Sequence, residues 1–173
     1  IHFYSICSLQ NRNPIRSISG FREIMTGWSY LASEIMQFYG YEDTPAMKFT
    51  RLRSLLQLVC CAIADLRYSL GEFNHKKVVA YISEHSYTMW RTAEALARRL
   101  HFQPMSYTLE LFAYNTLVEF RKFATKELKA DNKDVIEFIL TRGLTPPSLL
   151  AQEFTQIMQK KKGTPPHGKP AKK

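Results

Sequence analysis

The sequence predicts an all-α protein of about seven helices. Apolar residues recur at intervals of three and four over most of the chain, which is the period of an amphipathic helix. No segment alternates apolar and polar residues as a strand does. Glycine (7) and proline (8) are sparse, whereas a many-turned β-sandwich needs frequent turn residues. A chain of 173 residues is long enough for one domain with its own core.

The first two predicted helices have clear end signals. Residues 20–39 form the first, and Gly40 stands where a helix C-terminus favours glycine. After a loop, Thr44 is placed to cap the next helix, with Pro45 at its first position. That second helix covers residues 45–70 and is the most clearly amphipathic. Its single apolar stripe consists of Leu52, Leu55, Leu56, Val59, Ile63, Leu66 and Leu70.

The remaining helices are predicted by the same kind of signals. They cover residues 74–83, 87–100, 104–129, 132–142 and 146–161. Asn74 is placed to cap the first of these, and Gly143 to end the fourth. We therefore expect one helical domain over residues 1–162, with a solvated Pro/Lys-rich tail over 163–173.

Most of the excess positive charge of the chain lies near its C-terminal end. The net charge is +9, of which six lysines in the last 14 residues supply +6. These lysines are Lys160, Lys161, Lys162, Lys169, Lys172 and Lys173. We expect them to contact an acidic protein surface, an anionic lipid or RNA.

The composition of the chain also limits where in the cell we expect the protein. The longest apolar run covers 11 residues, too short to cross a bilayer, so we predict that the chain is not an integral membrane protein. Three cysteines, two of them adjacent, do not resemble a secreted disulfide framework. The chain begins at Ile1 rather than Met. Together with the basic balance, this favours a cleaved import sequence and a mitochondrial location, in the matrix or on the matrix face of the inner membrane; a cytoplasmic location is the alternative.

Motifs for metal, thiol or phosphate chemistry are weak. No two histidines lie three or four residues apart, so no helical zinc motif is present, and no Gly-rich phosphate loop occurs. We predict no metal and no cofactor. Cys60 and Cys61 lie within an apolar helix, where at least one is expected in the core. Cys7 lies near His2 and is the remaining thiol candidate.

Several short motifs follow one another in order along the chain. They are TGWSYLA at 26–32, GYED at 40–43, DLRY at 65–68, VAY at 79–81, ALARR at 95–99 followed by Pro104, FRKFA at 120–124 and GLTPPSLL at 143–150. This series resembles the C-terminal part of a bacterial family of zinc-peptidase-like proteins, marked by HExxPGHHLQ and EGWALYAE and formerly catalogued as a domain of unknown function. The resemblance implies a helical array like that of gluzincin-like, metallo-carboxypeptidase-like enzymes.

The departures from the family pattern fall on its site residues. Where the family has the His and Glu that begin HExxPGHHLQ, this chain has Ile1 and His2. The later substitutions replace His-His by Cys7 and Ser8, the Glu of EGW by Thr26, and the His after VDTGI by Ser69, whereas Arg99 keeps a family site residue. The resemblance thus implies a zinc site that has been lost, because these side chains do not replace imidazole and carboxylate ligands.

These observations favour a non-catalytic accessory subunit of a large multiprotein assembly. The candidate hosts are a mitochondrial respiratory-chain or ATP synthase complex, or a ribosome. Because the chain begins at the motif, we expect other subunits to cover apolar surface that the rest of the family protein would cover. The alternatives are a diverged hydrolase that uses Cys7, and a small module that binds RNA or anionic lipid through its basic tail.

Overall fold

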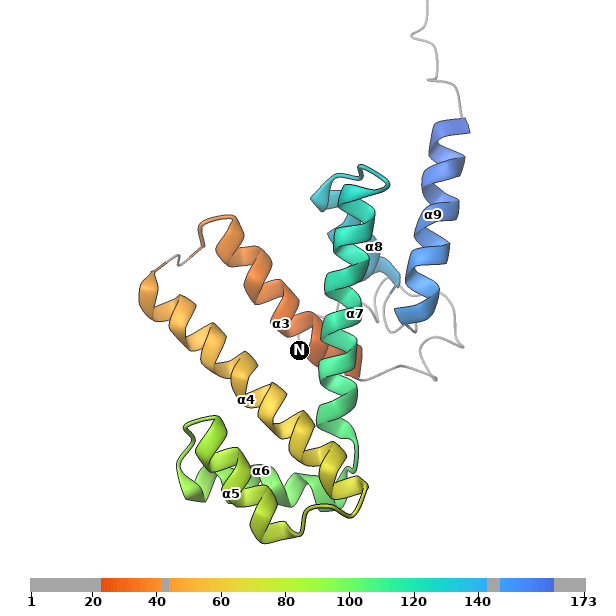
Figure 1. The fold of residues 1–173 in the computed structure, drawn as a ribbon. Helices are drawn as coiled ribbons and strands as arrows, with labels where there is room; N and C mark the ends of the chain where they lie inside the picture. Colours follow the sequence, from red (N-terminus) through yellow and green to blue (C-terminus); the bar gives the residue numbers. More distant parts are fainter. Residues whose placement is uncertain (1–22, 42–43, 143–146, 164–173) are drawn as a thin grey trace, which may run out of the picture. The chain divides into compact units, whose positions relative to one another are not determined.

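The chain folds into helices joined by short connections (Figure 1). The computed structural model describes residues 23–41, 44–142 and 147–163, and these contain seven α-helices and no strand. The helices are α3 (Glu23–Phe38), α4 (Pro45–Ser69), α5 (His75–His85), α6 (Trp90–Phe102), α7 (Ser106–Lys126), α8 (Asn132–Arg142) and α9 (Pro147–Gly163). The prediction of an all-α fold is confirmed. The expected tail beyond Gly163 lies outside the described residues.

The residues predicted to cap the starts of two helices do so, whereas Gly143, predicted to end a helix, lies outside the described residues. Thr44 Oγ1 accepts a hydrogen bond from the Met47 amide at 3.3 Å, and Pro45 occupies the first turn of α4. Asn74 Oδ1 accepts in the same way from the Lys77 amide, at 3.0 Å, at the start of α5. Each of these side chains therefore satisfies one of the amides that a helix N-terminus leaves without a partner.

Two helices begin two or three residues later than the sequence predicts. Tyr87 has φ +51° and Met105 has φ +64°, so each adopts a left-handed conformation that interrupts a helix. Consequently α6 starts at Trp90 rather than at Tyr87, and α7 starts at Ser106 rather than at Pro104. The spacing of apolar residues does not predict these left-handed backbone conformations.

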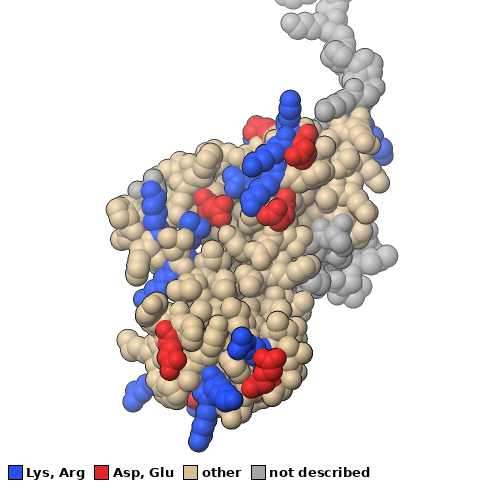
Figure 2. All heavy atoms as spheres, in the orientation of Figure 1, with Lys and Arg blue, Asp and Glu red and all other residues tan. Residues whose placement is uncertain are grey.

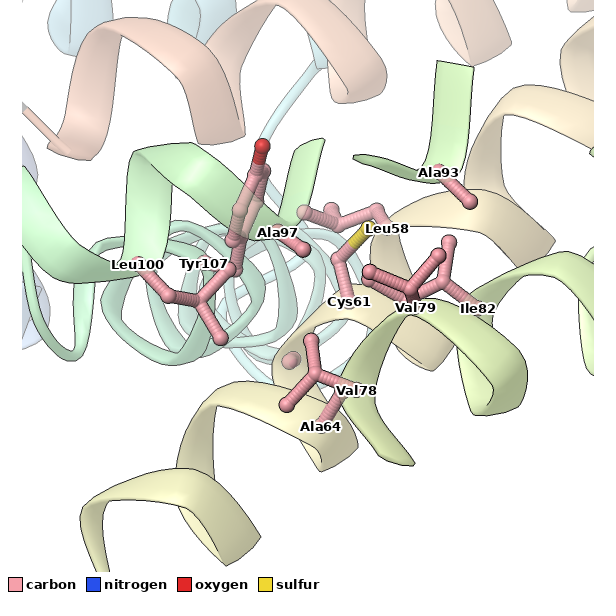
Figure 3. Close-up of a cluster of buried hydrophobic side chains, with 11 residues drawn as sticks. Leu58, Cys61, Ala64, Val78, Val79, Ile82, Ala93, Ala97, Leu100 and Tyr107 are labelled. Carbon is pink, nitrogen blue, oxygen red and sulfur yellow. The ribbon is translucent and has the colours of Figure 1, made fainter. Parts of the chain in front are cut away.

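The described chain divides within α7 into two compact units, one ending at Val118 and the other starting at Glu119. The core of the first unit is formed by α4, α5 and α6, whose buried side chains point toward one another in Figure 3. Its fully enclosed members include Cys61, Val79, Ile82 and Leu100. Small residues such as Ala64 and Ala97 let these helices approach closely.

Asp65 fixes the start of α7 within the first unit. Its side chain is completely buried on α4, and Oδ1 accepts from the Met105 amide at 2.9 Å. Oδ2 accepts from the amides of Tyr107 and Thr108 at 3.0 and 3.3 Å. A buried carboxylate is tolerated here because several helix N-terminal amides point at it and the helix dipole favours a negative charge. Asp65 thus joins α4 to α7.

Helix α3 also packs closely on α7. A Cβ atom on Gly27 would lie 2.6 Å from the backbone nitrogen of Tyr114, so only glycine allows this approach. Two turns further along α3, Glu34 Oε2 accepts a hydrogen bond from the Tyr114 hydroxyl at 3.1 Å. The close contact and the hydrogen bond set the distance between the two helices.

The second unit has an aromatic core. Phe120, Phe138 and Phe154 form a triangle of ring contacts, with centroid separations of 4.9 to 5.8 Å. Beside it, Arg142 Nε lies 3.5 Å from a Glu153 carboxylate oxygen, and the guanidinium stands over the Phe138 ring. These contacts join α7, α8 and α9.

The apolar stripe of α4 faces outward over most of its length. Leu58, Cys61 and Asp65 on the opposite side are buried, whereas Leu52 and Leu66 are 54% and 43% exposed. The amphipathic pattern predicts the helix correctly but points to the wrong side as its packed face. The reason is that the other helices pack against the side of α4 that carries Leu58 and the small residues Cys61 and Ala64, and not against Leu52 or Leu66.

Replacement of Asp65 by alanine is expected to destabilise the protein by about 3 kcal/mol, because buried amides at the start of α7 would lose their acceptor. Urea denaturation followed by circular dichroism measures this loss. The matched control is Glu72→Ala, an exposed carboxylate 4.0 Å from Arg67. We expect the control to change stability by less than about 0.5 kcal/mol. Equal losses in the two variants would contradict the capping role of Asp65.

Candidate functional site

A polar pocket of about 680 Å³ lies among α3, α4, α6 and α7 of the first unit. Its lining combines charged, amide, hydroxyl and thiol groups with a few apolar side chains. The polar members are Thr26, Tyr30, Gln57, Cys61, Arg99, Gln103, Ser106, Tyr107 and Glu110. A cavity of this size with convergent polar groups is the usual form of a small-ligand site.

Arg99 is the most constrained of these side chains. Its Nη2 donates to Glu110 Oε1, and its Nε donates to Gln103 Oε1 at 3.2 Å. The guanidinium also stands over the ring of Tyr107, 4.5 Å from the centroid. Glu110 is almost fully buried, whereas the Arg99 side chain is 38% exposed, so the ion pair is shielded from water on its carboxylate side only.

Thr26 lies on the same pocket, on α3. The structure therefore brings together two residues, Thr26 and Arg99, that the family resemblance identifies as site positions and that are far apart in sequence. Tyr30, one turn further along α3, also lines the pocket. Burial, followed by the nearby charge of Glu110, raises the pKa of Tyr30 above its usual value.

The remaining ionisable groups of the pocket are neutral near physiological pH. Burial raises the pKa of Cys61 to about 12, and burial likewise raises that of Tyr107 to about 12 although Arg99 opposes the shift. A thiol with such a pKa carries almost no thiolate. Among the described lining residues, the charges are therefore those of Arg99 and Glu110, which compensate each other.

Ser106 adds an unsatisfied polar atom to this pocket. Its Oγ is buried and has no hydrogen-bond partner among the described residues. Buried hydroxyls nearly always have a partner, so this atom marks a place where a polar ligand group or water would be stabilised. The sequence does not single out Ser106, and the only signal near it is Pro104, two residues before the helix.

The other predicted site residues do not join the pocket in the described part of the chain. Ser69 is the last residue of α4, is exposed, and is not among the lining residues. His2, Cys7 and Ser8 lie outside the described residues. Of the basic residues, Lys160 is exposed near the end of α9. The side chains of Lys161, Lys162, Lys169, Lys172 and Lys173 lie outside the described part.

The described wall of the pocket does not fit a zinc ion. Zinc in proteins is held by imidazole, thiolate and carboxylate groups. Here Thr26 stands where the family resemblance expects a carboxylate, Cys61 is a protonated thiol, and Glu110 is bound to Arg99. No cluster of three or more His, Cys, Asp or Glu residues suited to a metal occurs in the described residues.

Two histidines meet at a second place, which their sequence spacing does not predict. His75 Nδ1 lies 3.0 Å from His101 Nε2, while His75 Nε2 lies 3.0 Å from Glu94 Oε1. Tyr68 extends the chain through a 2.8 Å contact with His101 Nδ1. Because His101 and Glu94 contact opposite edges of the His75 ring, one ion cannot bind all three. This polar chain connects α4, α5 and α6.

Fold and pocket together define an all-helical protein with a partly buried Arg–Glu pair in a pocket among four helices. A family model described as "Bacterial protein of unknown function (DUF885)" matches residues 2–154, and the chain belongs to this family. No curated protein matches the chain. No solved structure matches it.

The family membership corrects one prediction. The mitochondrial location expected from the basic balance and the first residue is wrong, because the family is bacterial. Those two features are not specific to an imported protein, since lysine-rich segments occur in many settings. In the described residues, none of the helices has the length and apolarity that a bilayer crossing requires.

Because burial raises the pKa of the two buried thiols, we predict that alkylating reagents label them slowly in the folded chain. Burial raises the pKa of both Cys60 and Cys61, the latter to about 12, so at about pH 8 the Cys61 thiol remains protonated in the folded chain. Iodoacetamide should alkylate Cys61 at least about a hundredfold more slowly in the native chain than in urea, and Cys60 should also react more slowly in the native chain. Site-resolved mass spectrometry measures the two rates. Equal rates in the native and unfolded chain would contradict the burial.

Proposed function

We propose that this chain is a non-catalytic accessory subunit that binds another protein through the exposed face of α4. The observation that carries the proposal is the outward-facing apolar stripe of that helix. Its most exposed members are Leu52 and Leu70, which are 54% and 65% exposed, and Phe49, which is 67% exposed, extends the stripe by one helical turn. A continuous apolar surface of this kind is typical of interaction sites.

The apolar stripe extends along most of the exposed face of α4. It extends from Phe49 to Leu70, which spans about 32 Å along an α-helix at about 1.5 Å per residue. Every third or fourth residue in this interval is apolar. Contact with a partner would remove this surface from water, and each Å² of apolar area buried contributes about 25 cal/mol.

The pocket supports the non-catalytic part of the proposal. We infer that the family is metallopeptidase-like, and that the substitutions at Thr26 and Ser69 remove two of its zinc ligands. The protonated Cys61 offers no activated nucleophile in their place. The pocket keeps its Arg99–Glu110 pair, which binds charge but does not by itself carry out hydrolysis.

Zinc content and peptidase activity test the loss of catalysis. The purified chain should contain far less than one zinc per molecule after incubation with zinc and gel filtration, and should not cleave a mixed peptide library. Plasma mass spectrometry measures the metal, and mass spectrometry measures the peptides. One zinc per chain, together with turnover that a chelator abolishes, would overturn this part of the proposal.

Substitution of the stripe tests the interaction. Leu52→Gln with Leu66→Gln should shift the chain to a lower apparent mass in size-exclusion chromatography of native extract, because two exposed apolar contacts are lost. The matched control is Met89→Gln with Phe102→Gln, which changes two side chains that are 81% and 84% exposed away from α4. Circular dichroism should show both variants folded.

The control is expected to elute with the unaltered chain. The proposal fails if the stripe variant also elutes unchanged, or if the unaltered chain elutes as a free monomer.

A further inference from the structure

The exposed face of α4 follows the heptad pattern of a coiled-coil helix. Its apolar residues alternate in steps of three and four, which places them at the a and d positions. They are Phe49, Leu52, Leu56, Val59, Ile63, Leu66 and Leu70. Apart from Val59, which is half-buried, each of these side chains is at least 36% exposed. In the part of the chain that the structure describes, the helix therefore presents a largely exposed seam of three heptads.

The positions that flank this seam are basic. Arg53 and Arg67 occupy e positions, and Lys48 occupies a g position. All three side chains are exposed, and none of the e and g positions of this seam is acidic. In Figure 2, basic side chains gather around the N-terminal half of α4, at the left of the view. The e and g residues of a coiled coil determine which partner is accepted.

A second copy of this chain would meet its own positive charge. In a parallel pair, the g residue of one helix faces the e residue of the other, so Lys48 would face Arg53 of the second copy. In an antiparallel pair, e positions face each other, and Arg53 would face Arg67. Like charges that face each other across a seam are destabilising. The flanks thus select against self-association.

We propose that the partner of α4 is an amphipathic helix of another protein with acidic residues beside its own apolar seam. This rests on the proposed function and specifies its partner class. Opposite charges at the flanks would attract Lys48, Arg53 and Arg67, while the leucines pack between the helices. The mode is a helix pairing along α4, with apolar contacts giving affinity and charge giving selection.

Two synthetic peptides test the proposal on the full chain. Both are three heptads long with leucine at a and d; one has glutamate at e and g, the other lysine. Fluorescence anisotropy should show the acidic peptide binding at least about tenfold more tightly, because attraction at the flanks replaces repulsion. The difference should shrink as salt is added, because exposed charges are screened.

Charge reversal on α4 supplies the matched comparison. Arg53→Glu with Arg67→Glu should reverse the preference and favour the lysine peptide. The control Arg91→Glu with Lys126→Glu changes net charge equally at exposed positions outside α4, and should keep the preference for the acidic peptide. Arg67→Glu also removes the contacts of Arg67 with Glu72 and with the Phe73 ring, so circular dichroism must show that this variant is folded.

Three results would overturn the inference. They are equal binding of the two peptides, binding of neither, or a concentration-dependent dimer of the chain that Leu52→Gln with Leu66→Gln abolishes. None of these decides the proposed function, which depends on whether the same stripe variant leaves its assembly in native extract. A failure of the partner class and a failure of the subunit role are therefore distinguishable.

Discussion

The buried carboxylate of Asp65 is the constraint on which the first unit depends. It lies on α4 and accepts hydrogen bonds from amides at the start of α7, so it joins two helices that are separated by α5 and α6 in the sequence. Helix α7 then carries Tyr107 and Glu110 to the pocket, where they hold Arg99 of α6. The pocket geometry therefore follows from one buried cap and not from a loop.

The same cap decides which side of α4 is covered. Because Asp65 must face α7, the residues on its side of the helix, such as Leu58 and Cys61, become the core. The stripe that includes Leu52 and Leu66 is then left on the opposite side. An outward leucine stripe is costly in water for an isolated chain, and a partner that covers it offsets that cost.

Much of the fold could be predicted from local signals, because caps such as Thr44 and Asn74 act within one helical turn. The orientation of α4 could not be predicted in this way. The spacing of apolar residues predicts an amphipathic helix, but it does not show which elements pack on each side of that helix. The sequence predicts the pocket only in part. The family resemblance indicates Thr26 and Arg99 as site residues, but it does not indicate Glu110, because the pairing of Glu110 with Arg99 depends on tertiary structure and not on helical spacing.

The central claim is that a partner protein covers the leucine stripe of α4. Hydroxyl-radical footprinting with mass spectrometry tests it directly, by comparing side-chain oxidation in native extract with that in the purified chain. The account predicts that oxidation of Leu52 and Leu66 falls in extract, while Phe102, which is exposed at the end of α6, is oxidised equally in both. Equal oxidation of the stripe in the two samples would contradict the account.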